Sequence, residues 1–224
     1  MTNEELNLEY KSIINNIVAP ILKKIHFKKN GSHFYRDTGE IIQTFNFQKS
    51  PHNLGSSFSF VGNIGLSEKE TYLKLWNKSS LPKFPKYTDA IIRFRLGSIT
   101  HNGLDKWYSL NKKTIHNLKD EIYKDVLTLE AFFENHKTLS SIEKFFFDPA
   151  KISPYFGYLV SFALYHKLGK QKKAKRIIKK LYSTASNTGS NFFEKLFHKN
   201  NKITNKDWVE RIEKVARTYN TDLN

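Results

Sequence analysis

The sequence predicts an α+β fold: an N-terminal helix, a small antiparallel sheet of about four to five strands packed on helices, and an all-α C-terminal annex. Apolar residues recur at helical spacing over residues 4–25 and 114–135, and at helical spacing again from residue 140 onward. Between residues 27 and 110 the spacing is two, which is typical of strands. The strands are joined without long helices, so antiparallel neighbours are favoured.

The N-terminal helix is predicted by apolar residues that run from Leu6 to Ile25. Pro20 lies within this pattern, and its missing N–H should kink the helix or mark a second start. The annex should contain further helices, because its apolar residues also recur at helical spacing. Their expected ranges are 140–147, 154–167, 170–183, 191–198 and 205–219.

Alternating apolar and polar residues predict the strands. Their expected ranges are 27–35 with a Lys-Asn-Gly bend, 41–49, 57–66, 91–97 and 106–110. In the second strand, Phe45 and Phe47 should lie on one side, and Asn46 and Gln48 on the other. Residues 67–87 contain two prolines and little periodicity, and they predict a connection with one helical turn around Tyr72 to Trp76. We therefore expect an α+β domain over residues 1–137 and a basic helical annex over residues 138–224.

Composition excludes several classes of protein. Hydrophobic content of 39% with 18 Phe and 11 Tyr indicates a folded chain. Without cysteine, neither a disulfide framework nor a thiolate metal site is possible. The eight histidines form no H-E-x-x-H motif, and no glycine-rich phosphate loop is present, so we expect no metal and no cofactor. The acidic N-terminus and the lack of a long apolar run predict a cytoplasmic protein without a membrane segment.

The segment from Arg93 to Trp107 contains the most distinctive pattern. In an extended strand both arginines point to one face, and they could bind a carboxylate or phosphate beside the polar residues of a neighbouring strand. The expected binding face consists of Arg93, Arg95, Asn46, Gln48, Asp105 and Trp107. The alternative is structural: the arginines could be solvated or paired with Asp89 or Asp105, and Trp107 could close the edge of the core.

Positive charge is concentrated in one part of the chain. The formal net charge is +16, and residues 151–202 hold 12 basic residues and one acidic residue, Glu194. A helix there could bind a polyanion such as nucleic acid along its basic side. The candidate residues are Lys172, Lys173, Lys175, Arg176, Lys179 and Lys180. The alternative is a solvated helix face in a protein from an AT-rich, lysine-biased genome.

R-x-R-x-G followed by G-x-D-x-W, here Arg93 to Gly97 and Gly103 to Trp107, resembles a bacterial domain-of-unknown-function family, number four-three-zero-four. The resemblance covers about residues 8–135 and includes Phe34-Tyr35-Arg36 and Ile42-Gln43. It implies an α+β domain and provides no catalytic residues. Separately, a single hairpin at residues 154–183 is similar to one tetratricopeptide repeat. The matching residues are Tyr165, Gly169, Ala174, Ile178 and Leu181.

The pattern favours a non-enzymatic protein-interaction module, of the kind encoded in bacterial conflict or immunity loci. Its partner would be an unidentified protein that docks on the polar sheet face and the turn around Asn102 to Trp107. One alternative is a nucleic-acid-binding accessory protein that uses the basic helix at residues 165–180. Another is a small-anion-binding protein or an enzyme acting at Arg93 and Arg95.

Overall fold

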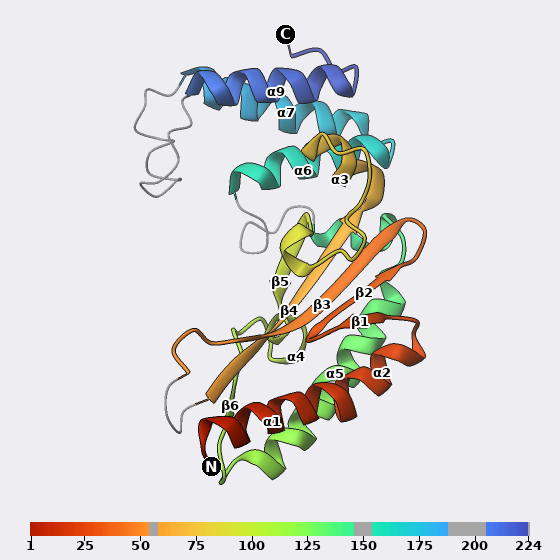
Figure 1. The fold of residues 1–224 in the computed structure, drawn as a ribbon. Helices are drawn as coiled ribbons and strands as arrows, with labels where there is room; N and C mark the ends of the chain where they lie inside the picture. The colour runs from red at the N-terminus through yellow and green to blue at the C-terminus, as the bar shows by residue number, and fades with distance from the viewer. Residues whose placement is uncertain (54–57, 146–153, 188–204, 224) are drawn as a thin grey trace. The chain divides into compact units, whose positions relative to one another are not determined.

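The computed structural model describes residues 1–53, 58–145, 154–187 and 205–223, and it confirms the α+β fold (Figure 1). The strands are β1 (Lys28–Asn30), β2 (His33–Asp37), β3 (Ile41–Lys49), β4 (Phe58–Glu68), β5 (Ile92–Arg95) and β6 (Trp107–Leu110). All neighbours are antiparallel, in the order β1-β2-β3-β4-β5, and β6 also pairs with β4. β4 is long enough to pair with β5 through residues 63–66 and with β6 through residues 58–61.

The α-helices are α1 (Asn3–Ile13), α2 (Ala19–Lys24), α3 (Lys69–Trp76), α4 (Gly97–Thr100), α5 (Ile115–Asn135), α6 (Pro154–Lys167), α7 (Gln171–Asn187) and α9 (Asn205–Thr218). A π-helical turn, η1 (Ile14–Val18), and two 3₁₀ turns, η2 (Tyr87–Asp89) and η3 (Ser140–Phe145), complete the described elements. The helix expected at residues 191–198 lies outside the described residues. Among those described, no helix combines the length and apolarity that a membrane crossing requires.

The chain divides into two compact units, which are discontinuous in sequence. The sheet unit comprises Met1–Lys69 and Ser80–Ile142, and the helical unit comprises Glu70–Ser79 and Glu143–Asn224. Residues 70–79 contain nearly all of α3, so a segment between β4 and β5 belongs to the helical unit.

Pro20 interrupts the N-terminal helix in the expected place. Thr2 and Glu5 form a capping box at the start of α1. Pro20 has no N–H to donate to the carbonyl four residues earlier, and the helix widens there. The N–H of Ala19 instead reaches the carbonyl of Ile14, and α2 begins with the proline in its first turn.

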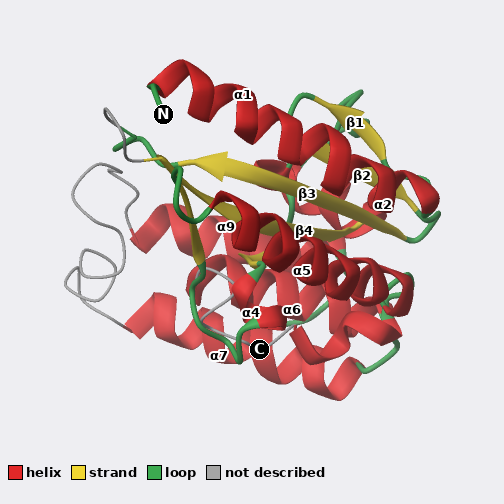
Figure 2. Ribbon diagram, turned by 90° about the horizontal axis from the view of Figure 1, so that it is seen from below, coloured by secondary structure: helices red, strands yellow, loops and turns green. Residues whose placement is uncertain are grey.

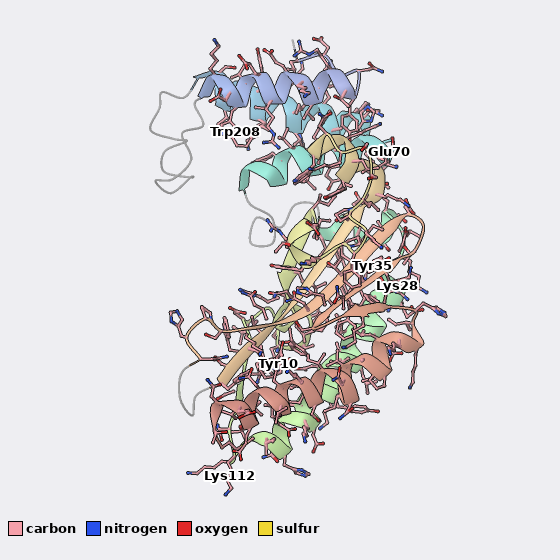
Figure 3. The ribbon with its side chains drawn as sticks, in the orientation of Figure 1. Tyr10, Lys28, Tyr35, Glu70, Lys112 and Trp208 are labelled. Carbon is pink, nitrogen blue, oxygen red and sulfur yellow. The ribbon has the colours of Figure 1, made fainter. Side chains whose placement is uncertain are left out.

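One face of the sheet packs on the helices of the sheet unit (Figure 2). The Tyr10 hydroxyl of α1 donates to the Phe47 carbonyl at 2.7 Å, and burial raises the pKa of Tyr10 to about 12. Figure 3 labels Tyr10 between α1 and the strands. Phe94 of β5 packs edge-on against Phe132 of α5 with centroids 5.7 Å apart. The two sides expected for β3 are confirmed, because Phe45 and Phe47 lie on this face.

Two residues of the family pattern, Arg36 and Gln43, fix the end of α5. The last carbonyls of a helix lack partners within the helix. Gln43 Nε2 donates to the carbonyls of Phe133 and His136 at 2.8 Å each, and Arg36 Nη1 pairs with Glu134 at 2.5 Å. Both side chains are buried, so these residues have a structural role on the helix-covered face.

The strand that bears the arginines ends earlier than expected. β5 stops at Arg95, and Leu96 is the N-cap of the short helix α4, which the alternation did not predict. Leu96 is nevertheless buried on the core side, because Gly62 of β4 leaves room for it. A Cβ at Gly62 would lie 2.7 Å from the Leu96 Cβ. In the connection after β4, the predicted helical turn is longer than expected and spans the whole of α3.

In the helical unit, α6 and α7 form the predicted hairpin. Gly169 has φ +72°, and the Lys170 N–H donates to the Tyr165 carbonyl at 2.9 Å, which closes the end of α6. Ala174 and Ile178 are buried against neighbouring helices, and Trp208 of α9 is 1% exposed. Glu70 of α3 pairs with Lys167 of α6 and, at 2.7 Å, with Lys74 (Figure 3).

Candidate functional site

Polar side chains form a row across four strands on the sheet face opposite α1 and α5. The strand register places His33 of β2 beside Asn46 of β3, Asn46 beside Asn63 of β4, and Asn63 beside Arg95 of β5. These four residues are named the polar ladder here. Gln48 of β3 and Trp107 of β6 both pair with Val61 of β4, which lies two residues before Asn63. Because side chains alternate between faces, Gln48 and Trp107 project on the same side as the polar ladder.

Asn63 is the centre of the polar ladder. It is 0% exposed. Its Oδ1 accepts a hydrogen bond from Arg95 Nη1, and its Nδ2 donates to Asn46 Oδ1 at 3.3 Å and Gln48 Oε1 at 3.1 Å. A buried amide is costly unless it is hydrogen-bonded, and these bonds meet that demand. The ladder therefore holds the guanidinium of Arg95 in a defined orientation.

Arg95 is also contacted by Asp105, just before β6, and by Trp107, the first residue of β6. Its guanidinium carbon lies 5.9 Å from the centroid of the Trp107 ring, and its Nε lies 3.9 Å from Asp105 Oδ1. The Trp107 indole N–H donates to Asp105 Oδ2 at 3.3 Å. Arg95, Asp105 and Trp107, the Arg95 cluster, thus combine an ion pair, a cation–π contact and a hydrogen bond. Trp107 remains 42% exposed, and Leu104, three residues earlier, is 69% exposed.

Two glycines of the family pattern explain how this segment reaches Arg95. A Cβ at Gly97 would lie 2.2 Å from the Leu104 carbonyl oxygen, so only glycine lets the backbone approach this closely. Asn102 and Gly103 both have positive φ, +52° and +87°, and the Leu104 N–H donates to the His101 carbonyl at 3.0 Å. This geometry confirms the predicted Asn-Gly turn.

At the other end of the polar ladder lies a pocket of about 360 Å³. His33, Asn46 and Gln48 contribute to its wall, and Tyr87 and Thr88 of the segment before β5 close one side. Burial, followed by the nearby charge of Lys86, lowers the pKa of His33, so the ring is uncharged at neutral pH. The pocket and the Arg95 cluster therefore lie on either side of Asn63, which is hydrogen-bonded to Asn46 and Gln48 of the pocket wall and to Arg95.

Of the six residues expected on the binding face, five come together. Asn46, Gln48, Arg95, Asp105 and Trp107 are joined directly or through Asn63. Arg93 lies on the same face, beside Gly65, and is exposed. No hydrogen bond or ion pair of Arg93 occurs among the described residues, so it stands apart from the ladder.

The basic residues of α7 lie mostly at the surface of the helical unit. Lys172, Lys173, Lys175, Arg176 and Lys180 are exposed, and Lys179 is half-buried. Lys173 lies 3.8 Å from Glu143 and 5.2 Å from the centre of the Tyr165 ring. The helix buries Ala174, Ile177 and Ile178, as its periodicity predicts.

A second polar cluster lies where α4 and β6 meet α5. His101 lies 3.7 Å from Glu121 through Nε2 and 3.9 Å from Asp125 through Nδ1. One ligand atom from each of the three lies within 4.8 Å of the others, so these residues could hold a cation. Both carboxylates already have partners: the Tyr108 hydroxyl donates to Asp125 at 2.5 Å, and the Lys106 ammonium contacts Glu121. The arrangement is a closed network that fastens β6 to α5.

Sequence reasoning missed Asn63 and the His101 cluster. Continuing the alternation of β4 from Ser59 through Val61 places Asn63 on the polar face, so a signal for it existed. His101, Glu121 and Asp125 had no such signal. Only the packing of α4 on α5 brings them together.

The match to a known protein family spans the whole sheet but only some of the helices. A family model described as Domain of unknown function (DUF4304) matches residues 18–156. The search of curated proteins and the search of solved structures each found no match. The matched range contains the polar ladder, the Arg95 cluster and α3, whereas α7 and α9 lie outside it.

Proposed function

Because the chain belongs to the family Domain of unknown function (DUF4304), whose match spans the whole sheet, we propose that its polar sheet face docks a protein partner. In this proposal the protein is a non-enzymatic interaction module. The observation that supports it is the Arg95 cluster, in which a positioned guanidinium lies beside an exposed Trp107. Arginine and tryptophan are enriched among the residues that dominate binding energy at protein interfaces.

The chemistry of the face indicates an acidic partner that also carries an apolar residue. Arg93 is exposed on the face, Arg95 is partly exposed, and the chain carries a formal charge of +16. A partner carboxylate would complement the arginines, and an apolar side chain would cover Leu104 and Trp107. The arrangement within the face suits a partner better than a small anion, because Asn63 and Asp105 already engage Arg95.

The test is capture of partners from cells that express the chain natively, with the full chain as bait, followed by calorimetry on any stoichiometric protein recovered. Arg93→Glu and Leu104→Asp change exposed side chains of the face without touching the ladder. Each should weaken binding of the recovered protein by about tenfold or more, as expected for residues at the centre of an interface.

Matched controls distinguish docking from general attraction. Leu8→Asp introduces the same change at a residue that is 60% exposed on α1, and Lys112→Glu reverses an exposed charge after β6 (Figure 3). Both should leave binding unchanged. Recovery of no stoichiometric protein, or equal losses in the controls, would argue against the proposal.

The exposure of the α7 lysines favours a second candidate, non-specific binding of nucleic acid. Released counterions would make the affinity fall steeply with salt. Titrating DNA and RNA at several salt concentrations tests it, with wild type and a variant that carries Lys172→Glu, Lys175→Glu and Arg176→Glu. A salt-independent affinity, or one that survives the charge reversals, would exclude α7 as the binding element.

A further inference from the structure

A pocket of about 570 Å³ lies within the helical unit, between α3 and α9. Among the ten described residues that line it, four are basic and none is acidic. The basic residues are Lys74, Lys78, Arg211 and Lys214. The rest of the wall includes Leu73 and Val215 and the indole of Trp76. This hollow, the α3–α9 pocket, therefore combines a cationic rim with apolar surface.

Local structure explains why the cations gather. α3 ends at Trp76, Asn77 has φ +50°, and the Lys78 N–H returns to the Leu73 carbonyl at 2.9 Å. This closure places Lys78 beside the last turn of its own helix. On α9, Arg211 and Lys214 are three residues apart and share one face of the helix.

No acidic residue of α9 is among the described residues that line the pocket. Glu213 accepts a hydrogen bond from the Tyr182 hydroxyl of α7 at 3.3 Å, and it does not line the pocket. The C-terminal segment is balanced in charge along the sequence, with four basic and four acidic residues in 203–224. Because Arg211 and Lys214 lie on the same face of α9, two positive charges nevertheless meet at the α3–α9 pocket.

A structural role accounts for only some of the four basic side chains that line the α3–α9 pocket. Lysines near the last turn of α3 stabilise the negative end of the helix, and Lys74 pairs with Glu70 at 2.7 Å. Arg211 is half-buried, its guanidinium lies 5.6 Å from the Trp208 ring, and burial lowers its pKa. Same-sign charges around a concave, low-dielectric wall focus the field there and attract an ion of opposite sign.

We propose that the α3–α9 pocket binds an organic anion that joins at least two negative charges to a flat apolar group, as a nucleotide does. Its volume lies within the range of small-molecule sites, about 300–1,000 Å³. Arg211, Lys78 and Lys214 would receive the phosphates, and Trp76 and Val215 would contact the base. Because α9 lies outside the family match, the site depends on one helix that the family domain does not include.

Calorimetry on the full chain tests the proposal, with ATP, pyrophosphate and adenosine as probes at moderate salt. ATP should bind more tightly than either fragment. A variant with Lys78→Glu and Lys214→Glu should weaken ATP binding by about tenfold or more, since both changes place a carboxylate at the rim. Both residues are exposed, so the variant should fold, and circular dichroism checks that it does.

The matched control carries Lys112→Glu and Lys113→Glu in the segment after β6, which change the net charge equally at exposed residues outside the pocket. It should bind ATP like wild type. Equal weakening in both variants would assign the binding to general attraction and overturn the proposal, as would no binding of ATP by the wild type. Pyrophosphate that binds as tightly as ATP would overturn the role of the apolar wall.

A second readout uses Trp76 itself. ATP should quench part of the tryptophan fluorescence of the wild type, because the base would contact the indole. A Trp76→Leu variant should lose that change while it retains the signal of the two other tryptophans. Quenching that persists in Trp76→Leu would place the base elsewhere and overturn the proposed pose.

Discussion

Asn63 is hydrogen-bonded to Asn46 and Arg95 of the polar ladder and to the neighbouring Gln48, and its replacement would leave all three short of a partner. We expect Asn63→Ala to lower the free energy of unfolding by about 1–3 kcal/mol, the usual cost of leaving a buried polar group unpaired. Urea unfolding measures the change. Ser109→Ala on β6 alters an exposed residue of the same face and is the control. A stability equal to wild type would show that the ladder does not hold the face together.

Tyr108 and Asp125 form a buried hydrogen bond whose strength should depend on pH. Burial raises the pKa of Asp125 above its ordinary value of 3.8, while the bond from Tyr108 opposes that rise. A raised carboxyl pKa means that stability falls as the pH rises from 3.8 through the folded-state pKa. Without the hydroxyl, the pKa should rise further and the fall should be larger.

We therefore expect Tyr108→Phe to lower the free energy of unfolding by about 1–3 kcal/mol at neutral pH. The loss should be smaller at a pH below 3.8, where the raised pKa keeps Asp125 protonated in the folded chain. Unfolding curves at the two pH values measure it. Tyr123→Phe on α5 removes a hydroxyl from a side chain that is 50% exposed and should change neither curve. An equal loss at both pH values would contradict the assignment to Asp125.

Individual residues of the site were predictable where one strand determines their direction. Arg95, Asn46 and Gln48 follow from alternation alone, because a strand directs every second side chain to the same face. Their mutual contacts depend on the register between strands, which places Asn63 between them. Register is a tertiary property, and the pattern within one strand does not specify it.

At the scale of elements, α4 and the turn after it position the Arg95 cluster. Gly97→Ala would bring a Cβ to 2.2 Å from the Leu104 carbonyl oxygen and push the turn away. We expect a loss of about 1–3 kcal/mol, typical of overpacking, and weaker binding of any partner at the face. Ser98→Ala in the same helix is the control for stability. Unchanged stability and binding in Gly97→Ala would show that the close approach is dispensable.

α3 is held to α6 by an ion pair with a defined pH response. Hydrogen bonds from Lys167 and Lys74 lower the pKa of Glu70 from 4.5 to about 2. The stabilisation is therefore fully present above pH 4.5 and is lost as the pH falls towards 2.

The Glu70 side chain is 52% exposed, so solvent screens the pair. We expect Glu70→Gln to lower the free energy of unfolding by less than about 1 kcal/mol at neutral pH. The difference should vanish in strong acid. Thermal unfolding at several pH values measures it, with Glu210→Gln on α9 as the control. A difference that persists at low pH would exclude the charge as its source.

Most elements were predictable because their periods are long and regular, as in α5 and β3. The short helix α4 was not: it has only four residues, and its backbone turns where Leu96 reaches the core beside Gly62. The same limit applies to α3. It has only eight residues, and its membership in the helical unit depends on partners far along the chain.

At the scale of the whole molecule, the helical unit is incomplete without α3. Tyr72 and Leu75 of α3 are buried, and the helix is part of the unit that contains α6, α7 and α9. We expect a chain shortened to residues 1–142 to expose these two side chains, self-associate and bind a hydrophobic dye. Light scattering and dye fluorescence measure this.

The control is the same shortened chain with Tyr72→Gln and Leu75→Gln, which should remain monomeric and bind less dye. If the shortened chain is monomeric and does not bind the dye, α3 does not need the later helices to cover it.

The placement of α3 also constrains the order in which the protein can be completed during synthesis. α3 leaves the ribosome well before α9, and at about 5–20 residues per second the interval is on the order of ten seconds. During that time the flanking strands can pair, whereas α3 must wait for its neighbours. A newly made chain would therefore expose the apolar side of α3 between two strands that are already paired, and a chaperone could bind there.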